Sequence, residues 1–356
     1  MAKKIGVLIV DDSAFMRKVL KDIMESAGDI RVLGTAGDGA AALEKVRELN
    51  PDVITLDVEM PGMDGMTCLR ELQKITDAPV IIVSGLNRDG ERATIEALAA
   101  GAVDLITKPT ALFDIEGEEK RNEIIEKIRM TKGIRRKAGG KDAVKDETLP
   151  AGGGHEGRKS GLLKTLIAIG TSTGGPRALQ EVLPYIPGNI PAAVLIVQHM
   201  PPGFTKSLAD RLNTLSGLYV KEAEEGEAVK PGYSYVAPGD YHMKVVKSPE
   251  GALKIKLTRE ALVNGHRPAV DVMMDSIAET GFPDVVGVIM TGMGADGSKG
   301  IVNIKKANKG YIISQDEKSC VVYGMPKAAA KTGVVDEVVP LKKIAEVIVK
   351  YLGVDH

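Results

Sequence analysis

The chain has 356 residues, with 47 Lys and Arg against 48 Asp and Glu and a formal net charge of −1. Because a single hydrophobic core seldom grows to this size, we expect two domains. The balanced charge argues against nucleic acid or an anionic membrane surface as the main partner, although local charged patches remain open.

Cysteine usage and the first apolar run indicate the compartment. Cys68 and Cys320 are far apart in the sequence and fit neither a disulfide framework nor a metal-ligand cluster, which is typical of a reducing cytosol. The apolar run 5–10 is too short for a signal-peptide core or a membrane span. We therefore expect a cytoplasmic protein without membrane insertion.

Residues 1–130 are expected to form the first domain, because apolar runs alternate there with amphipathic stretches. This alternation predicts five βα units, and hence a flavodoxin-like (βα)5 domain with helices on both faces of a parallel sheet. The expected strands are Gly6–Val10, Val32–Ala36, Val53–Leu56, Val80–Val83 and Val103–Ile106. The expected helices are Ala14–Ser26, Ala40–Leu49, Gly65–Lys74, Arg92–Ala100 and Glu118–Met130.

Polar residues follow these strands at the sheet edge where ligands bind in doubly wound folds. The residues are Asp11, Asp12, Asp57, Ser84 and Lys108. Three converging carboxylates repel one another unless a cation lies among them, and an all-oxygen cluster suits Mg²⁺. The lysine and the serine would then serve a transient anion. As the alternative, the aspartates are strand-end and capping groups, and the lysine only belongs to a turn.

In these features the first 120 or so residues resemble the receiver domain of two-component response regulators. The motifs that carry the resemblance are Asp11–Ser13, Asp57 with Met60–Gly65, Ser84–Gly85 and Lys108–Pro109. It implies phosphorylation of Asp57 and a Mg²⁺ site made by Asp11, Asp12, Asp57 and the backbone of Glu59. It also implies that Ser84 and Lys108 contact the phosphoryl group.

One position departs from that family. Receivers usually carry an aromatic switch residue three positions before the lysine, and this chain has Leu105 there. Signalling by an aromatic flip is therefore in doubt.

The stretch 131–161 loses hydrophobic periodicity and is rich in glycine and charge, which predicts a flexible linker. Its basic run 135–137 is open to a second interpretation, as a docking site for a partner.

The remaining residues, 162–356, predict a second doubly wound α/β domain with a mainly parallel sheet and an antiparallel excursion. Parallel strands are expected near Leu163–Ile169, Ala192–Gln198, Val285–Met290 and Tyr311–Ser314. Antiparallel strands are expected at Tyr233–Val236, Met243–Val246 and Leu253–Leu257. Helices are expected near Arg177–Tyr185, Thr205–Leu215, Val270–Thr280, Gly300–Ala307, Pro326–Thr332 and Leu341–Tyr351.

A glycine-rich turn between the first strand and helix of this domain contains a candidate nucleophile. Gly170 and Gly174 flank Ser172 in a G-x-S-x-G pattern, which presents a hydroxyl at the head of a sheet. The short pattern also recurs by chance, so a simple chain reversal or a phosphate-binding loop stays open on this turn alone.

Two residues at other strand ends could activate that serine. His199 follows the second strand as a candidate base, and Asp296 lies in the loop after Val285–Met290, where it would orient the histidine. Either residue alone could be structural, the histidine as a hydrogen-bonded strand end and the aspartate as a helix cap. His242 and His266 are rival bases that we interpret as pocket wall or substrate contacts, with Arg267 beside them.

This constellation resembles the catalytic domain of the chemotaxis protein-glutamate methylesterases, the CheB family. The motifs that carry the resemblance are Gly170–Gly175, Gln198–Pro201, Gly203–Phe204, Ala237–Gly239, His266–Pro268, Val270–Asp271, Thr291–Gly294 and Asp296–Gly297. It implies hydrolysis of glutamate γ-methyl esters on chemoreceptor helices, with deamidation of receptor glutamines as a related activity. A chemotaxis histidine kinase is the implied phosphodonor, and the esterase reaction needs no cofactor.

The mechanism assigns Ser172 as nucleophile, His199 as base and Asp296 as the group that orients the base. Two N–H groups should face the developing oxyanion, and we expect those of Thr173 and Met293. Another serine hydrolase, such as a thioesterase or protease, and a non-catalytic binding module are the competing hypotheses.

Overall fold

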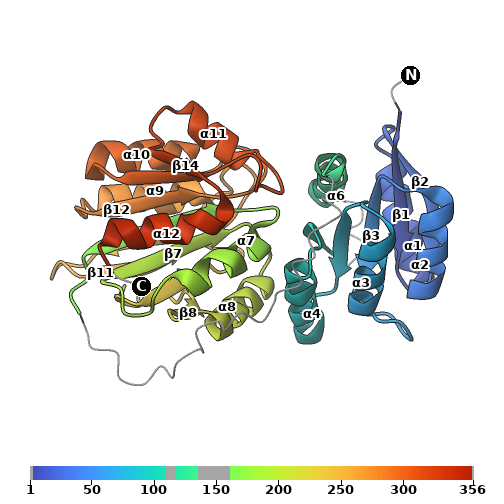
Figure 1. Ribbon diagram of the computed structural model, residues 1–356, viewed down its shortest axis with the longest axis horizontal. Helices are drawn as coiled ribbons and strands as arrows, with labels where there is room; N and C mark the ends of the chain where they lie inside the picture. The colour runs from blue at the N-terminus through green and yellow to red at the C-terminus, as the bar shows by residue number, and fades with distance from the viewer. Residues whose placement is uncertain (1–2, 110–116, 135–160, 355–356) are drawn as a thin grey trace. The chain divides into compact units, whose positions relative to one another are not determined.

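The computed structural model describes residues 3–109, 117–134 and 161–354, and the chain divides into two compact units, Met1–Lys145 and Asp146–His356 (Figure 1). Most of the predicted linker 131–161 lies outside the described residues. The domain boundaries that we drew from composition therefore stay a prediction.

The first unit is a five-stranded parallel sheet in the order β2-β1-β3-β4-β5, flanked by helices, as the sequence predicts. Its strands are β1 (Ile5–Val10), β2 (Ile30–Ala36), β3 (Val53–Asp57), β4 (Val80–Ser84) and β5 (Asp104–Thr107). Its helices are α1 (Ala14–Glu25), α2 (Gly39–Leu49), α3 (Gly65–Ile75), α4 (Arg88–Ala99) and α6 (Glu118–Thr131). α1 packs against α6, while α2 packs against α3 and α3 against α4.

Local sequence fixes where the first four of these helices begin. Ser13, Asp38, Asp64 and Asn87 are the N-caps of α1 to α4, and each side chain accepts a hydrogen bond from a backbone N–H in the first turn. Such a cap contributes about 1 kcal/mol. The caps of α1, α2 and α4 follow their strands within three residues, which keeps these connecting loops short at the carboxyl edge of the sheet.

The second unit contains a seven-stranded sheet in the order β14-β13-β12-β6-β7-β9-β8, in which all neighbouring strands are parallel. Its strands are β6 (Thr165–Thr171), β7 (Ala192–Gln198), β8 (Tyr219–Glu222), β9 (Tyr233–Val236), β12 (Val285–Ile289), β13 (Tyr311–Gln315) and β14 (Glu337–Val339). A separate antiparallel hairpin pairs β10 (His242–Lys247) with β11 (Leu253–Thr258). The mainly parallel α/β fold with an antiparallel excursion is confirmed.

One strand direction was predicted wrongly. We expected Tyr233–Val236 to be antiparallel, but β9 runs parallel to β7 and β8. The alternation of polar and apolar residues reports which face of a strand is buried and carries no information about direction. The short edge strands β8 and β14 were not predicted, since their few residues give too weak a pattern.

Helices cover both faces of this sheet (Figure 1). They are α7 (Gly175–Val182), the 3₁₀ turn η1 (Leu183–Tyr185), α8 (Phe204–Leu215), α9 (Val270–Glu279), α10 (Ser298–Asn308), α11 (Met325–Lys331) and α12 (Leu341–Leu352). α7 packs against α8 and α12, and α9 packs against α10. The hairpin lies along α9, where the Ser276 hydroxyl accepts a hydrogen bond from Val245 N at 2.9 Å.

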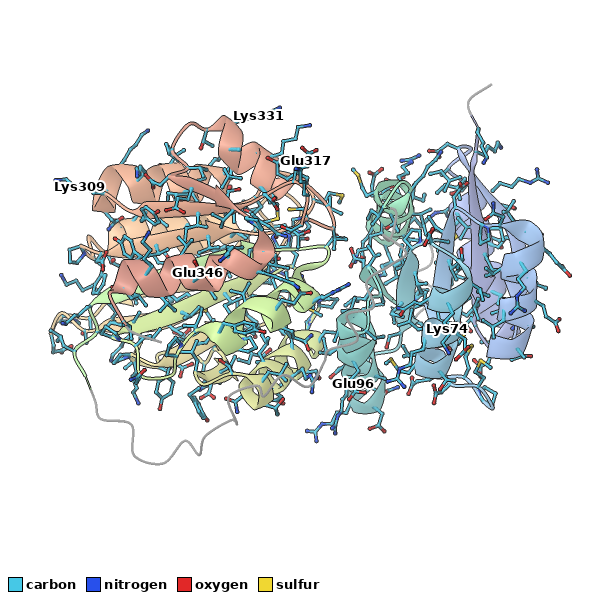
Figure 2. The ribbon with its side chains drawn as sticks, in the orientation of Figure 1. Lys74, Glu96, Lys309, Glu317, Lys331 and Glu346 are labelled. Atoms are coloured by element: carbon cyan, nitrogen blue, oxygen red, sulfur yellow. The ribbon has the colours of Figure 1, made fainter. Side chains whose placement is uncertain are left out.

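Charged side chains project from the outer faces of the helices of both units (Figure 2). Many form exposed ion pairs such as Lys74 with Glu71 at 2.6 Å, which contribute at most about 1 kcal/mol. Within the described part of the chain, no helix combines the length and the apolar character needed to span a membrane.

Candidate active site

Each unit has a cluster of polar side chains at the carboxyl edge of its parallel sheet. In the first unit the strand order reverses between β1 and β3, and in the second between β6 and β12. In open α/β sheets this reversal leaves a crevice between diverging connections, which is where ligands bind. Both clusters lie at such a point.

The cluster of the first unit is acidic. Asp11 and Asp57 are buried and Asp12 is exposed, and one carboxylate oxygen from each lies within 4.8 Å of the others. The Lys108 ammonium lies 2.6 Å from Asp57 Oδ2 and 3.2 Å from Asp11 Oδ2. Burial favours the neutral amine, but these two carboxylates outweigh it and raise the pKa of Lys108. An all-oxygen set of this geometry fits Mg²⁺.

The other residues predicted for this cluster adjoin it. Glu59 donates its N–H to Asp57 Oδ1 at 3.0 Å. Buried Ser84 ends β4 next to Val83, which pairs with Asp57 in the sheet. Leu105 is buried within β5, with 3% of its surface exposed. The structure therefore places the three carboxylates and Lys108 together, with Ser84 at the end of the neighbouring strand.

The cluster of the second unit contains Ser172, which follows β6 and retains 9% exposure. Its N–H donates to Thr291 O at 3.0 Å, and its carbonyl accepts from Gly175 N at 2.7 Å. Gly174 adopts φ +78°, a left-handed conformation that favours glycine. A Cβ at Gly170 would lie 2.3 Å from a methyl group of Val270, so close packing of β6 on α9 demands that glycine.

His199 and Asp296 meet at the same sheet edge. Their side chains are joined by a hydrogen bond of 2.8 Å between His199 Nε2 and Asp296 Oδ2. Asp296 is 2% exposed and also accepts the N–H groups of Val270, Asp271 and Gly297 at 2.7, 2.9 and 3.0 Å. Burial alone would raise the pKa of Asp296, but the contacts with His199 and these N–H groups outweigh it and lower the pKa. The carboxylate is therefore charged at neutral pH.

The ring of His199 is oriented by this bond. With Nε2 on the carboxylate, Nδ1 is the nitrogen that can accept the proton of Ser172, the reverse of the ring orientation in chymotrypsin-like triads. Nδ1 is buried and has no hydrogen-bond partner among the described residues, so no bond to the serine is yet formed. Catalytic hydrogen bonds often close only when substrate binds.

The three predicted substrate contacts have different surroundings. The His266 ring stacks on the His199 ring, with centroids 3.8 Å apart and planes 13° apart, so it forms part of the cluster. His242 is fully buried, and its Nε2 lies 3.0 Å from Ala261 O, which leaves it no surface for a substrate. Arg267 pairs with Asp240 at 2.5 Å. The expectation of direct substrate contact is thus not met for His242, and Arg267 is engaged in holding its own loop.

The loop predicted to complete an oxyanion hole lies beside the nucleophile. A Cβ at Gly292 would lie 2.8 Å from Ser172 Cβ, so only glycine allows this approach. The N–H of the next residue, Met293, has no hydrogen-bond partner among the described residues. Thr173 is attached to the same loop through its carbonyl, which accepts a bond from Thr291 Oγ1 at 3.0 Å.

Sequence reasoning missed the function of Asp271, which forms a reciprocal cap with Asp296. Asp296 precedes α10 but caps α9, whereas Asp271 in the first turn of α9 caps α10 by accepting Lys299 N and Gly300 N at 3.1 and 2.8 Å. Burial raises the pKa of Asp271 to about 6. The N-cap residues of these two helices are Ala269 and Gly297, which have no side chain that could cap a helix. Their presence at the two helix starts is the one signal in the sequence that the caps come from elsewhere.

Comparisons with known proteins show the family of each unit. Residues 167–348 match the family described as CheB methylesterase, and residues 7–117 match the response regulator receiver domain. A Pyrococcus horikoshii relative named protein-glutamate methylesterase/protein-glutamine glutaminase is 48% identical over 350 residues, which cover 98% of this chain and 94% of that protein. A Thermotoga maritima relative of the same name is 45% identical over 97% of this chain and 98% of its own length.

A solved structure covers the second unit. The crystal structure of the Thermotoga maritima CheB methylesterase catalytic domain is 47% identical, with a TM-score of 0.50, and covers 53% of this chain and 98% of that domain. The resemblance drawn from the motifs is confirmed over nearly the full length. The chain belongs to the CheB methylesterase family and has a response regulator receiver domain at its N-terminal side.

Proposed function

We propose that this chain is a phosphorylation-regulated protein-glutamate methylesterase and protein-glutamine glutaminase that acts on chemoreceptors, with Ser172, His199 and Asp296 as its catalytic triad. The observation that carries the proposal is the buried His199–Asp296 pair, 2.8 Å apart, at the strand-order reversal that also presents Ser172. The names of the full-length relatives supply the substrate class.

The proposed reaction uses the three residues of the triad in turn. Ser172 Oγ attacks the γ-carbonyl carbon of a glutamate methyl ester, and His199 Nδ1 takes the hydroxyl proton. The C–O bond to the methoxy group then breaks, and the same nitrogen returns the proton, so that methanol leaves and an acyl-serine remains. Water attacks the acyl-serine by the same proton transfers and releases glutamate. With a glutamine side chain, the leaving group is ammonia.

Two neighbouring features assist these steps. The negative charge that forms on the carbonyl oxygen would be stabilised by the N–H groups of Thr173 and Met293, and loss of one such donor raises the barrier by roughly 3 kcal/mol. The positive charge that forms on His199 is balanced by Asp296, whose lowered pKa keeps it ionised. The esterase reaction needs no metal in this scheme.

The first unit supplies the regulation. We propose Asp57 as the phosphorylated residue, with a chemotaxis histidine kinase as donor and with Ser84 and Lys108 contacting the phosphoryl group. Asp11, Asp12, Asp57 and the backbone of Glu59 would hold Mg²⁺, which offsets negative charge during phosphoryl transfer. The acidic oxygens within 4.8 Å of one another support this assignment. The thiols of Cys68 and Cys320 are free, in keeping with a cytoplasmic site of action.

The experiment that tests the proposal measures methanol release from methyl-labelled receptor membranes. We expect the wild type to release methanol and Ser172→Ala to release almost none. A serine on α8 provides the matched control, and Ser207→Ala should keep wild-type activity. Reaction of Ser172 with a fluorophosphonate but no methanol release would indicate a different serine hydrolase, and no reaction at all would indicate a non-catalytic module.

Regulation is tested separately in the full chain. A small phosphodonor with Mg²⁺ should label wild type and change its methanol release, whereas Asp57→Asn should show neither effect. Stoichiometric labelling of Asp57→Asn would move the phosphorylation site to another residue.

A further inference from the structure

Gln198, the last residue of β7, has contacts that the reaction scheme leaves without a purpose. It is 2% exposed, and its Nε2 donates to two carbonyl oxygens, that of Ser172 at 3.0 Å and that of His199 at 3.1 Å. A single amide group therefore links the backbones of the nucleophile and the base. Because both partners are acceptors, the amide must present its nitrogen to them.

The other end of this amide indicates that the contact is specific. Gln198 Oε1 is buried and has no hydrogen-bond partner among the described residues. An unpaired buried polar atom lowers stability, and it persists in folded proteins mainly where strain or function retains it. An apolar side chain of the same size would avoid this penalty but would remove the donor from the carbonyls of Ser172 and His199, so what distinguishes glutamine here is that it joins these two segments.

The space around the amide has no room for a side chain at position 175. A Cβ at Gly175 would lie 2.0 Å from Gln198 Oε1 and 2.3 Å from Thr171 Oγ1, so a larger residue at position 175 would displace the amide, the threonine or both. Gly175 N and Gln198 Nε2 donate to the same acceptor, the carbonyl oxygen of Ser172, at 2.7 and 3.0 Å. These two donors hold that carbonyl toward the interior of the unit.

Peptide geometry carries this restraint to the reacting atoms. In a planar trans peptide, the C=O of one residue and the N–H of the next point in opposite directions. When the Ser172 carbonyl is held against Gln198, the Thr173 N–H must point away from Gln198. Rotation of this peptide about its flanking bonds would turn the same N–H inward and remove it from the oxyanion position.

We propose that Gln198 is a positioning residue of the esterase: its amide fixes the plane of the Ser172–Thr173 peptide, and hence the direction of the Thr173 oxyanion donor, while it ties His199 to the nucleophile. This inference rests on the proposed function, because it requires Ser172 as nucleophile and Thr173 N–H as a donor. Gln198 touches neither the substrate nor the reacting atoms.

The test compares Gln198→Met, which keeps the volume and removes the donor, with Gln198→Glu, which places a carboxylate against two carbonyls. Gln180→Met is the matched control, since Gln180 on the adjacent helix α7 also donates to a backbone carbonyl, that of Pro176, at 3.1 Å. The assay is methanol release from methylated receptor by the full chain, with kcat and KM determined separately and thermal unfolding recorded for each variant.

For Gln198→Met we expect kcat to fall roughly 10- to 100-fold with KM nearly unchanged, because a misdirected oxyanion donor acts on the transition state alone. Gln198→Glu should be slower still. The rate at which a fluorophosphonate modifies Ser172 should fall by a similar factor, because its P=O oxygen occupies the oxyanion position. Gln180→Met should leave all three quantities unchanged.

A kcat for folded Gln198→Met within about twofold of the Gln180→Met value would overturn the inference, as would a loss confined to KM. If the Gln198 variants fail to fold, Gly175→Ala in a Thr171→Ala background places the added methyl group against the amide alone, and a kcat equal to that of Thr171→Ala would equally overturn the inference. Failure of the proposed function gives a different result, since the wild type would then release no methanol, or Ser172→Ala would release it as fast as the wild type.

Discussion

The two polar clusters occupy equivalent places in their sheets but compensate their charge differently. In the first unit, three carboxylates share one lysine, and the few hydrogen bonds to Asp57 come from Lys108 and Glu59 N. In the second, the single carboxylate of Asp296 accepts four hydrogen bonds. In the functions that we propose, the first cluster must rearrange when a phosphoryl charge is added, whereas the second must hold its geometry through the reaction. The difference in bonding follows these two requirements.

Asp296→Asn is the sharpest test of the cluster that contains Ser172, His199 and Asp296. The amide oxygen can still accept the N–H groups of Asp271 and Gly297, but the NH₂ group replaces Oδ2 and cannot accept from His199 Nε2 or from Val270 N. The mismatch with His199 favours the wrong tautomer of the base, and we expect methanol release to fall about 10⁴-fold. Loss of the bond from Val270 N should lower stability by about 1 to 3 kcal/mol. Asp275→Asn, at a half-buried aspartate on α9, should have no effect. Activity within about tenfold of wild type would show that Asp296 does not orient the base.

Asp271 tests whether the reciprocal cap makes the stability of the second unit depend on pH. A pKa raised to about 6 means that the folded state binds the proton more tightly than the unfolded state. The stability contributed by this group is therefore complete below about pH 4 and is lost as pH rises through about 6. Ionisation of Asp271 therefore lowers the free energy of unfolding by about 3 kcal/mol, because an ordinary aspartate has a pKa of about 3.9.

Asp271→Asn should remove this dependence and keep both caps, since an amide oxygen can accept the same two N–H groups. We expect the variant to be more stable than wild type above pH 7, with the difference vanishing near pH 4 when unfolding is followed by denaturant titration. A variant that is less stable than wild type at every pH would mean that the carboxylate charge itself holds α10.

The acidic cluster of the first unit should also gain stability when one of its charges is removed. Asp57→Asn removes one of three mutually repelling carboxylates, while Lys108 keeps its contact with Asp11 at 3.2 Å. We expect a gain of about 1 kcal/mol in the first unit without divalent cations, at the expense of phosphorylation. Hydrogen exchange of the β1 amides measures this unit separately. Faster exchange in the variant would show that the cluster is stabilised by its charge.

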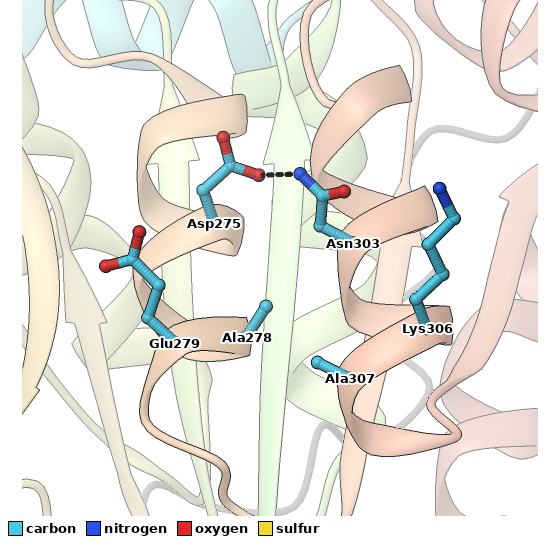
Figure 3. Close-up of a pocket in the computed structure, with 6 residues that line it drawn as sticks. All are labelled: Asp275, Ala278, Glu279, Asn303, Lys306 and Ala307. Carbon is cyan, nitrogen blue, oxygen red and sulfur yellow. Dashed lines mark hydrogen bonds between the residues drawn. The ribbon is translucent and has the colours of Figure 1, made fainter.

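The smallest effect is expected at the groove between α9 and α10, which is lined by Asp275, Ala278, Glu279, Asn303, Lys306 and Ala307 (Figure 3). There Asn303 donates to Asp275 Oδ1 at 2.8 Å on an exposed surface. Asn303→Ala should change the free energy of unfolding by less than about 0.5 kcal/mol, since water replaces the bond. A larger loss of unfolding free energy would mean that this surface contact holds α9 and α10 together. It would then weaken the case that the Asp271 cap does so.

Much of the candidate site could be predicted from local sequence. Apolar runs that end in Asp11, Asp57, Ser172 and His199 define strands and the residues that follow them. In a parallel sheet those residues share one edge, so their convergence follows without coordinates. The glycines around Ser172 were readable for the same reason, because a sharp turn restricts which residues can occupy it.

Other features depended on contacts between distant segments. The direction of β9 is set by the strands on either side of it, and Asp296 caps a helix 26 residues before it in the chain. The stacking of His266 on His199 and the hydrogen bonds from Gln198 to two backbone carbonyls likewise join separate segments of chain. Periodicity and capping propensity act over a few residues, so they determine which elements form and where they end. Which nitrogen of His199 faces Asp296, and which way the Ser172 carbonyl points, were decided only when the tertiary structure packed those elements together.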